Sequence, residues 1–133
     1  MTPRISLFIA ALHALLYLAL SVRVVLQRRA KRIGVGSGGD QTLALRVRVH
    51  ANFGEYVPLA LLLLALLELC GSPALLVWSC GLGLLVARLL HATGLGGSPG
   101  YSFGRFAGTL LTFLLLLVMA LAGVWQMLAL QLV

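Results

Sequence analysis

Acidic side chains are scarce in this chain, which has three aspartate and glutamate residues against ten lysine and arginine residues. Charged residues of both signs make up only 10% of the sequence, whereas 61% of the residues are hydrophobic. Soluble domains carry about one-quarter charged residues, so the composition excludes an ordinary water-soluble domain and indicates a membrane protein. The net charge of +7 does not indicate nucleic-acid binding, because such proteins present their basic residues on a water-exposed fold. We therefore expect no nucleic-acid partner.

Cysteine is also rare, and the two examples are Cys70 and Cys80. Cys70 is expected at the membrane surface and Cys80 about two helical turns inside, so we do not expect a disulfide between them. No Cys-x-x-Cys pair or His/Cys cluster has the spacing of metal ligands, and we expect no metal site. Both thiols are predicted to be packing residues.

Long apolar runs are what the sequence has in abundance. They predict helices at about 5–27, 41–69, 74–93 and 103–132. Each is long enough for a hydrocarbon core of about 30 Å, and none shows the alternation that a membrane β-barrel requires. The first run ends in a basic cluster at 28–32, which indicates a membrane helix and not a cleaved leader. The sequence thus predicts an all-α membrane protein, a single domain over 1–133 that forms a bundle of four transmembrane helices.

Glycine and proline residues carry further predictions. The glycine-rich segment 33–40 lacks the Gly-Lys-Ser/Thr ending of a phosphate loop, so it does not indicate a nucleotide site. Pro58 should bend the second helix, because proline removes a backbone hydrogen bond and clashes with the preceding turn. Gly104 and Gly108 have the spacing that lets two membrane helices approach closely.

A few polar residues lie within the apolar runs, away from the basic segments. His13 and Tyr17 are one helical turn apart, and we expect them to form interhelical or interfacial hydrogen bonds. Glu68 is expected to be a solvated residue at a helix end.

The distribution of basic residues predicts the orientation. Only Arg4 lies at the N-terminal face, and the other nine basic residues flank or occupy the first and third connections. Because cytoplasmic loops are enriched in lysine and arginine, we expect these two connections in the cytoplasm. We therefore predict an integral membrane protein with both termini on the non-cytoplasmic side.

One stripe of polar residues opens the second helix. At 100° per residue, Arg48, Asn52 and Glu55 share one helical face. Three more polar residues are expected at the same membrane end, from the end of the third helix and the start of the fourth: Arg88, His91 and Arg105. Arginines can take carboxylates and a glutamate can take an ammonium, so this set suits an anionic ligand that carries an amine. Interfacial arginines that fix orientation, and an Arg–Glu pair that joins helices, are the structural alternative.

The pattern Arg-x-x-x-Asn-x-x-Glu-Tyr-x-Pro, formed by Arg48, Asn52, Glu55, Tyr56 and Pro58, resembles the signature of the MAPEG family, the membrane-associated proteins in eicosanoid and glutathione metabolism. The pair Arg88 and His91 is similar to a motif of one branch of that family. Arg105 at the start of the fourth helix fits the family as well. Small bacterial inner-membrane members also look similar to this chain.

The resemblance implies a homotrimer that binds glutathione between subunits, near the cytoplasmic face of a bacterial inner membrane. By motif position, the residues that would hold the tripeptide are Arg48, Asn52, Glu55, Tyr56, Arg88 and His91. Arg105 would be the catalytic residue beside the sulfur, where a guanidinium favours the thiolate. The implied function is a glutathione-dependent transferase or peroxidase that acts on lipophilic electrophiles or lipid substrates.

Two alternatives stay open. One branch of the family is a non-catalytic scaffold, so a lipid- or thiol-binding membrane scaffold is the first. It is favoured by Ala51, where some relatives have arginine, and by the absence of aromatic residues at Leu89, Thr93 or Leu95. The second is a small membrane assembly or transport component, in which the polar stripe joins helices.

Overall fold

The computed structural model describes residues 2–94 and 102–131, and the side chains up to Ala129. It contains four helices: α1 (Arg4–Lys31), α2 (Gln41–Leu69), α3 (Ala74–Gly94) and α4 (Phe103–Gln131). All four are long and apolar enough to cross a membrane. The shortest, α3, has 21 residues and is about 30 Å long at 1.5 Å per residue. The predicted all-α architecture of four membrane helices is confirmed.

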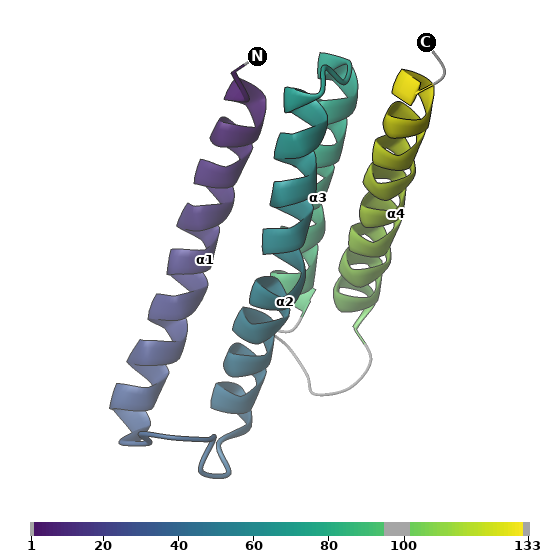
Figure 1. The fold of residues 1–133 in the computed structure, drawn as a ribbon. Coiled ribbons are helices and arrows are strands. Elements are labelled where there is room, and N and C mark those ends of the chain that lie inside the picture. Colours follow the sequence, from purple (N-terminus) through teal and green to yellow (C-terminus); the bar gives the residue numbers. More distant parts are fainter. Residues whose placement is uncertain (1, 95–101, 132–133) are drawn as a thin grey trace.

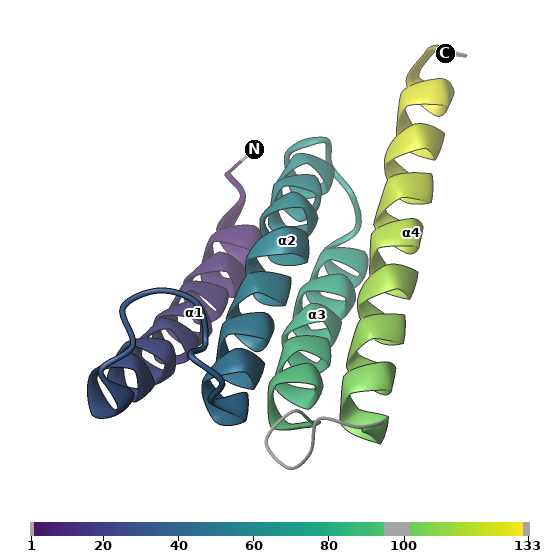
Figure 2. The same ribbon diagram turned by 90° about the horizontal axis from the view of Figure 1, so that it is seen from below.

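The helices run side by side, and neighbours in sequence are antiparallel (Figure 1). The start of α1 and the end of α4 therefore lie at the same end of the bundle, and the 32–40 loop lies at the other. α1 and α4 occupy opposite edges (Figure 2), and within the described residues their backbones do not approach each other closely. α2 and α3 both contact α1 and α4, so they form the centre of the bundle.

Apolar side chains from all four helices form the core. One cluster includes Ile9, Leu64, Leu84 and Met119, each almost fully buried. A second cluster, centred on Phe53, lies between α1, α2 and the end of α3. By contrast, much of the apolar surface of α4 is exposed, for example at Trp125. Such surface needs lipid or another protein chain to cover it.

α3 and α4 pack with almost no side chain between their backbones at one end. A Cβ atom at Gly108 would lie 2.5 Å from the carbonyl oxygen of Ala87, and one at Gly104 would lie 2.9 Å from that of Leu90. Only glycine allows this separation, so the close approach predicted from the spacing of the two glycines is confirmed.

α1 extends further than the apolar run predicts, through the basic cluster to Lys31 instead of ending at about residue 27. Arginine and lysine are good helix formers, and cations in the last turn are favoured by the helix dipole. The helix stops at Arg32, which adopts a left-handed conformation with φ 54° and bonds back to the last turn.

Glu68 is not a solvated end residue, and that prediction was wrong. Its side chain is buried, at 8% exposed, and it accepts hydrogen bonds from the first turn of α1. The donors are the N–H of Ile5, the N–H of Ser6 and the Ser6 hydroxyl, at 2.9, 2.7 and 2.6 Å. A helix begins with unpaired N–H groups, and at α1 a carboxylate from α2 binds them.

The prediction of an interhelical hydrogen bond was wrong for the Nδ1 atom of His13, and Tyr17 contacts the neighbouring helix through its ring. His13 Nδ1 contacts the carbonyl of Ile9 in its own helix, at 2.8 Å. Tyr17 stacks on His50 and Phe53 of α2, with ring centroids 4.5 and 5.3 Å apart. The two residues join α1 to α2 through rings, because aromatic faces pack well between apolar helices. Cys80 is buried, as expected of a packing thiol, whereas Cys70 is exposed at the end of α2, so the packing role predicted for it was wrong.

Candidate functional site

The predicted polar residues lie at the end of the bundle where α2 and α4 begin and α3 ends. The stripe residues belong to α2, Arg88 and His91 to the last two turns of α3, and Arg105 to the first turn of α4. We call this set the polar cluster: Arg48, Asn52, Glu55, Tyr56, Arg88, His91 and Arg105. Its members come from three helices that the topology brings together.

Arg88 is the most unusual member, because its side chain is only 2% exposed. Nη1 donates a hydrogen bond of 2.8 Å to Oδ1 of Asn52, which joins α3 to α2. Within the described part of the chain, neither Nε nor Nη2 has a hydrogen-bond partner. Arg88 lies six residues before the end of α3, about 9 Å into the helix. A buried guanidinium is expensive unless an acceptor or an anion binds it.

Arg48 and Glu55 form a second contact on the outer side of α2. Arg48 Nη1 lies 3.4 Å from Oε1 of Glu55, and the two side chains are 67% and 46% exposed. The predicted stripe therefore brings these two residues together, two helical turns apart. An exposed pair of this length contributes little stability, so both groups can exchange partners.

Tyr56 and His91 lie between these contacts and α4. The ring of Tyr56 is 5.3 Å from that of Phe113 on α4. His91 is buried against Gly108, and its imidazole is within electrostatic range of Arg88, Arg105 and Arg48. All three arginines of the polar cluster thus lie at the same end of the bundle.

The polar cluster is electropositive, because Glu55 is its only carboxylate. The chain has three acidic residues, and the other two are engaged elsewhere. Glu68 binds the start of α1, and Asp40 lies 3.3 Å from Lys31 in the loop between α1 and α2. With three guanidinium groups and one carboxylate, the polar cluster favours binding of an anion. Arginine is well suited to bidentate binding of carboxylates.

The sequence reasoning missed the role of Asp40, which begins α2. Its Oδ1 accepts a hydrogen bond of 2.6 Å from the N–H of Leu43, and Gln27 donates to the same oxygen at 3.3 Å. The bond from Leu43 holds the pKa of the Asp40 carboxyl below its usual value, and Lys31 adds to this effect although partial desolvation opposes it. An aspartate directly before a helical segment is a familiar start signal, so the sequence did contain the information.

Pro58 lies inside α2, which continues unbroken through it to Leu69. The helix is thus compatible with the proline, and the polar stripe and the apolar part of α2 belong to one element. The Leu95 and Tyr101 positions lie outside the described residues.

Comparison with known proteins relates the whole chain to one family of membrane proteins. The model of the MAPEG family matches residues 6–125. The inner membrane protein YecN of Escherichia coli strain K12 is 36% identical over 123 residues, which is 92% of each chain. The protein of the same name in Escherichia coli O6:H1 strain CFT073 has the same identity and coverage. No solved structure is significantly similar to the chain. The match over nearly the whole length, together with the four membrane helices, shows that this integral membrane protein belongs to the MAPEG family.

Proposed function

We propose that this protein binds glutathione in the polar cluster. The thiol of the bound glutathione then reacts with lipophilic electrophiles dissolved in the bilayer. The substrates are electrophilic small molecules or lipid hydroperoxides. Membership of a family named for glutathione metabolism supports the choice of thiol, and the electropositive cluster supports the choice of an anionic ligand.

The observation that carries the proposal is the guanidinium of Arg88. It is buried and bound to Asn52, and two of its nitrogens, Nε and Nη2, have no hydrogen-bond partner in the described residues. A buried cation in that condition is stabilised by an anion that completes its hydrogen bonds. A carboxylate of glutathione is such an anion.

The remaining groups of glutathione suit the other members of the polar cluster. Glutathione carries two carboxylates and one ammonium group, so it needs more than one cation and at least one anion around it. Arg48 is exposed and can take the second carboxylate, and Glu55 can take the ammonium once the ligand separates the pair. Tyr56 and His91 complete the binding set between α2 and α4.

Arg105 is the residue we assign to the chemistry. A guanidinium beside the thiol favours the thiolate, which is the nucleophile, and a low-dielectric site strengthens this effect. In the transferase reaction the thiolate sulfur forms a bond to the electrophilic carbon, and the leaving group departs with its electron pair. In the peroxidase reaction two glutathione thiols supply two electrons and two protons. The O–O bond of the hydroperoxide breaks, and the products are an alcohol, water and glutathione disulfide.

We further propose that the site is completed in a homotrimer, with glutathione between subunits. The exposed Arg48 and Glu55, and the uncovered apolar face of α4, support an assembly in which a second chain covers them. The basic residues at this end of the bundle support a cytoplasmic position, with both termini on the other side. The relative named an inner membrane protein supports the same membrane for this chain.

A non-catalytic lipid- or thiol-binding scaffold is the second candidate. It is favoured by the last turns of α3, which lack the aromatic residues expected near this position from the resemblance to some enzymatic members of the family. Here Leu89 is exposed, and the hydroxyl of Thr93 donates to the Leu89 carbonyl at 2.9 Å, so it is occupied within its own helix. Neither residue offers a group for chemistry.

A turnover assay separates the two candidates. Purified protein in detergent is given glutathione and a chlorinated nitrobenzene or a fatty-acid hydroperoxide, and thioether or alcohol formation is followed. We expect Arg105→Ala to lower the rate on the order of 100-fold while glutathione binding and assembly persist. Arg105→Lys, which keeps a cation, should retain more activity. If the wild type binds glutathione without turnover, the protein is a non-catalytic scaffold. If Arg105→Ala leaves turnover unchanged, Arg105 has no catalytic role.

A further inference from the structure

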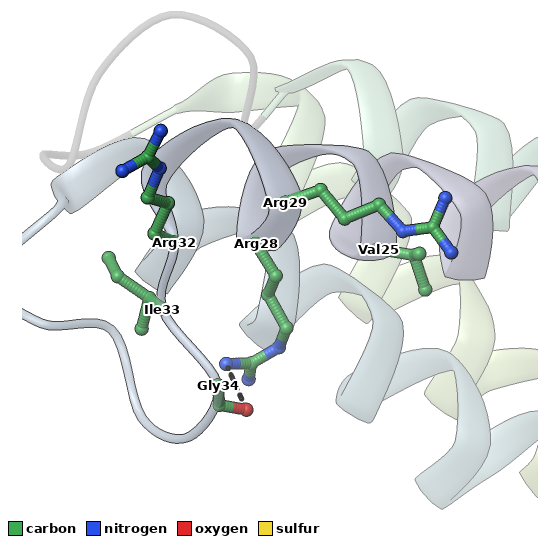
Figure 3. Close-up of a pocket in the computed structure, with 6 residues that line it drawn as sticks. All are labelled: Val25, Arg28, Arg29, Arg32, Ile33 and Gly34. Atoms are coloured by element: carbon green, nitrogen blue, oxygen red, sulfur yellow. Dashed lines mark hydrogen bonds between the residues drawn. The ribbon is translucent and has the colours of Figure 1, made fainter.

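Three arginines surround the C-terminal end of α1, outside the polar cluster. Arg28, Arg29 and Arg32, which we call the basic collar, line a shallow open hollow of about 330 Å³. Its remaining lining residues are Val25, Ile33 and Gly34. Figure 3 shows Arg28 reaching toward the loop, while Arg29 and Arg32 extend away from Arg28 in opposite directions. We propose that the basic collar binds the phosphate of an anionic phospholipid, independently of the glutathione site.

The loop after α1 holds Arg28 in position. Its Nη1 donates to the carbonyl oxygens of Gly34 and Gly36, at 3.3 and 2.9 Å. Gly36 has φ 68°, a conformation that favours glycine, so the direction of its carbonyl depends on that residue. Because this guanidinium is already fixed, a ligand that binds it loses less conformational entropy.

Within the part of the chain that the structure describes, no carboxylate pairs with the basic collar. Among the described residues, no hydrogen bond or ion pair engages the side chain of Arg29 or Arg32. Asp40 is the one carboxylate of the adjoining loop, and it binds Lys31 and the N–H of Leu43 instead. Three cations without a carboxylate fit the oxygens of a phosphate.

The surroundings of the basic collar indicate a lipid and not a free phosphate. Val25 and Leu26 are exposed on the membrane-spanning part of α1, directly before Arg28. At 1.5 Å per residue, the collar therefore begins within about 5 Å of lipid-facing side chains, at the depth of the headgroups. On the loop side, Val35 is 92% exposed. Because apolar residues lie on both sides of the basic collar, the site suits a molecule with a phosphate and acyl chains.

The test is a lipid titration of the detergent-purified wild type, read by native mass spectrometry. Phosphatidylglycerol is compared with phosphatidylcholine of the same acyl chains, and we expect the anionic lipid to bind on the order of 10-fold more tightly. R29Q/R32Q should abolish this preference. The matched control is R23Q/R46Q, which removes the same charge from the same half of the bundle and should keep the preference within about 2-fold. Circular dichroism and size-exclusion chromatography establish that each variant is folded and assembled.

Equal losses in R29Q/R32Q and R23Q/R46Q would overturn the proposal, because they would reveal general charge attraction without a site. Displacement of phosphatidylglycerol by millimolar inorganic phosphate or glycerol phosphate would also overturn it, since the ligand would then be a soluble phosphate. If R29Q/R32Q does not assemble, the single variants R29Q and R32Q decide. Each single variant should weaken binding of the anionic lipid about 5-fold. An unchanged preference for the anionic lipid in both variants would contradict the proposal.

Discussion

The carboxylate of Glu68, in the last turn of α2, binds the first turn of α1 through Ser6. Oε2 accepts hydrogen bonds from the N–H and the hydroxyl of Ser6, at 2.7 and 2.6 Å. α1 has no acidic residue in its own first turn and no side-chain bond from Pro3, so Glu68 provides the cap that the helix lacks locally. The contact fastens the start of the first helix to the end of the second.

We expect Glu68→Ala to lower the free energy of unfolding by about 1–3 kcal/mol, because it leaves the N–H groups at the start of α1 without an acceptor. Glu68→Gln should lose less, since one side-chain oxygen remains. Unfolding in detergent, followed by circular dichroism, measures both variants. An Ala variant as stable as the wild type would mean that the cap does not contribute.

The contact between α3 and α4 predicts a contrast between two glycines. Gly108→Ala would place a Cβ 2.5 Å from the Ala87 carbonyl, whereas at Gly123 the nearest side-chain atoms are 3.9 Å away. Because the added methyl group forces α3 and α4 apart, Gly108→Ala should lower the free energy of unfolding by about 1–3 kcal/mol. Gly123→Ala should be neutral or slightly stabilising, because alanine is the better helix former. Thermal unfolding of the two variants is the measurement, and equal stability would contradict the observed packing.

Asp40 predicts a dependence of stability on pH. The hydrogen bond from the Leu43 N–H lowers the pKa of Asp40 in the folded protein, so the carboxylate stabilises the fold above its usual pKa near 4. This stabilisation is lost as the pH falls through the lowered pKa. Asp40→Asn keeps a helix cap but does not titrate. We expect the difference in thermal midpoint between wild type and Asp40→Asn to shrink between about pH 5 and pH 2. A difference that stays constant over this range would exclude Asp40 as the titrating group.

Glu55 distinguishes a ligand site from a contact that only joins helices. Its pair with Arg48 is exposed and 3.4 Å long, and such pairs contribute about 0–1 kcal/mol. Glu55→Gln should therefore leave the thermal midpoint of the unliganded protein nearly unchanged. It should weaken glutathione binding on the order of 10-fold, because the ammonium group of glutathione loses its counter-charge. Both quantities come from thermal-shift titration. Loss of assembly with unchanged ligand affinity would favour the structural role.

The sequence predicted most of the fold because the apolar runs set the helices. Helical periodicity also placed Arg48 and Glu55 on one face, and the structure brings them into contact. The spacing of Gly104 and Gly108 predicted the close approach of α3 and α4 for the same local reason. These features depend on residues within one helix.

Most of what the sequence did not predict concerns contacts between helices. The role of Glu68 depends on which helix start lies beside the end of α2, and no spacing within α2 gives that information. The burial of Arg88 against Asn52 depends likewise on how α3 packs on α2. The end of α1 was placed too early because hydropathy falls at the basic cluster, whereas arginine and lysine continue the helix.

The central claim is that the polar cluster binds glutathione through Arg88, and isothermal titration of the purified protein with glutathione tests it most directly. The variants are Arg88→Met, which keeps the length of the side chain without its charge, and Arg46→Met as a control, since Arg46 bonds to the Arg23 carbonyl on α1 and is not part of the polar cluster. We predict saturable binding by the wild type and by Arg46→Met, and a loss of at least about 100-fold in folded, assembled Arg88→Met. Arg88→Met that binds glutathione as tightly as the wild type, or a folded wild type that does not bind it, would contradict the account.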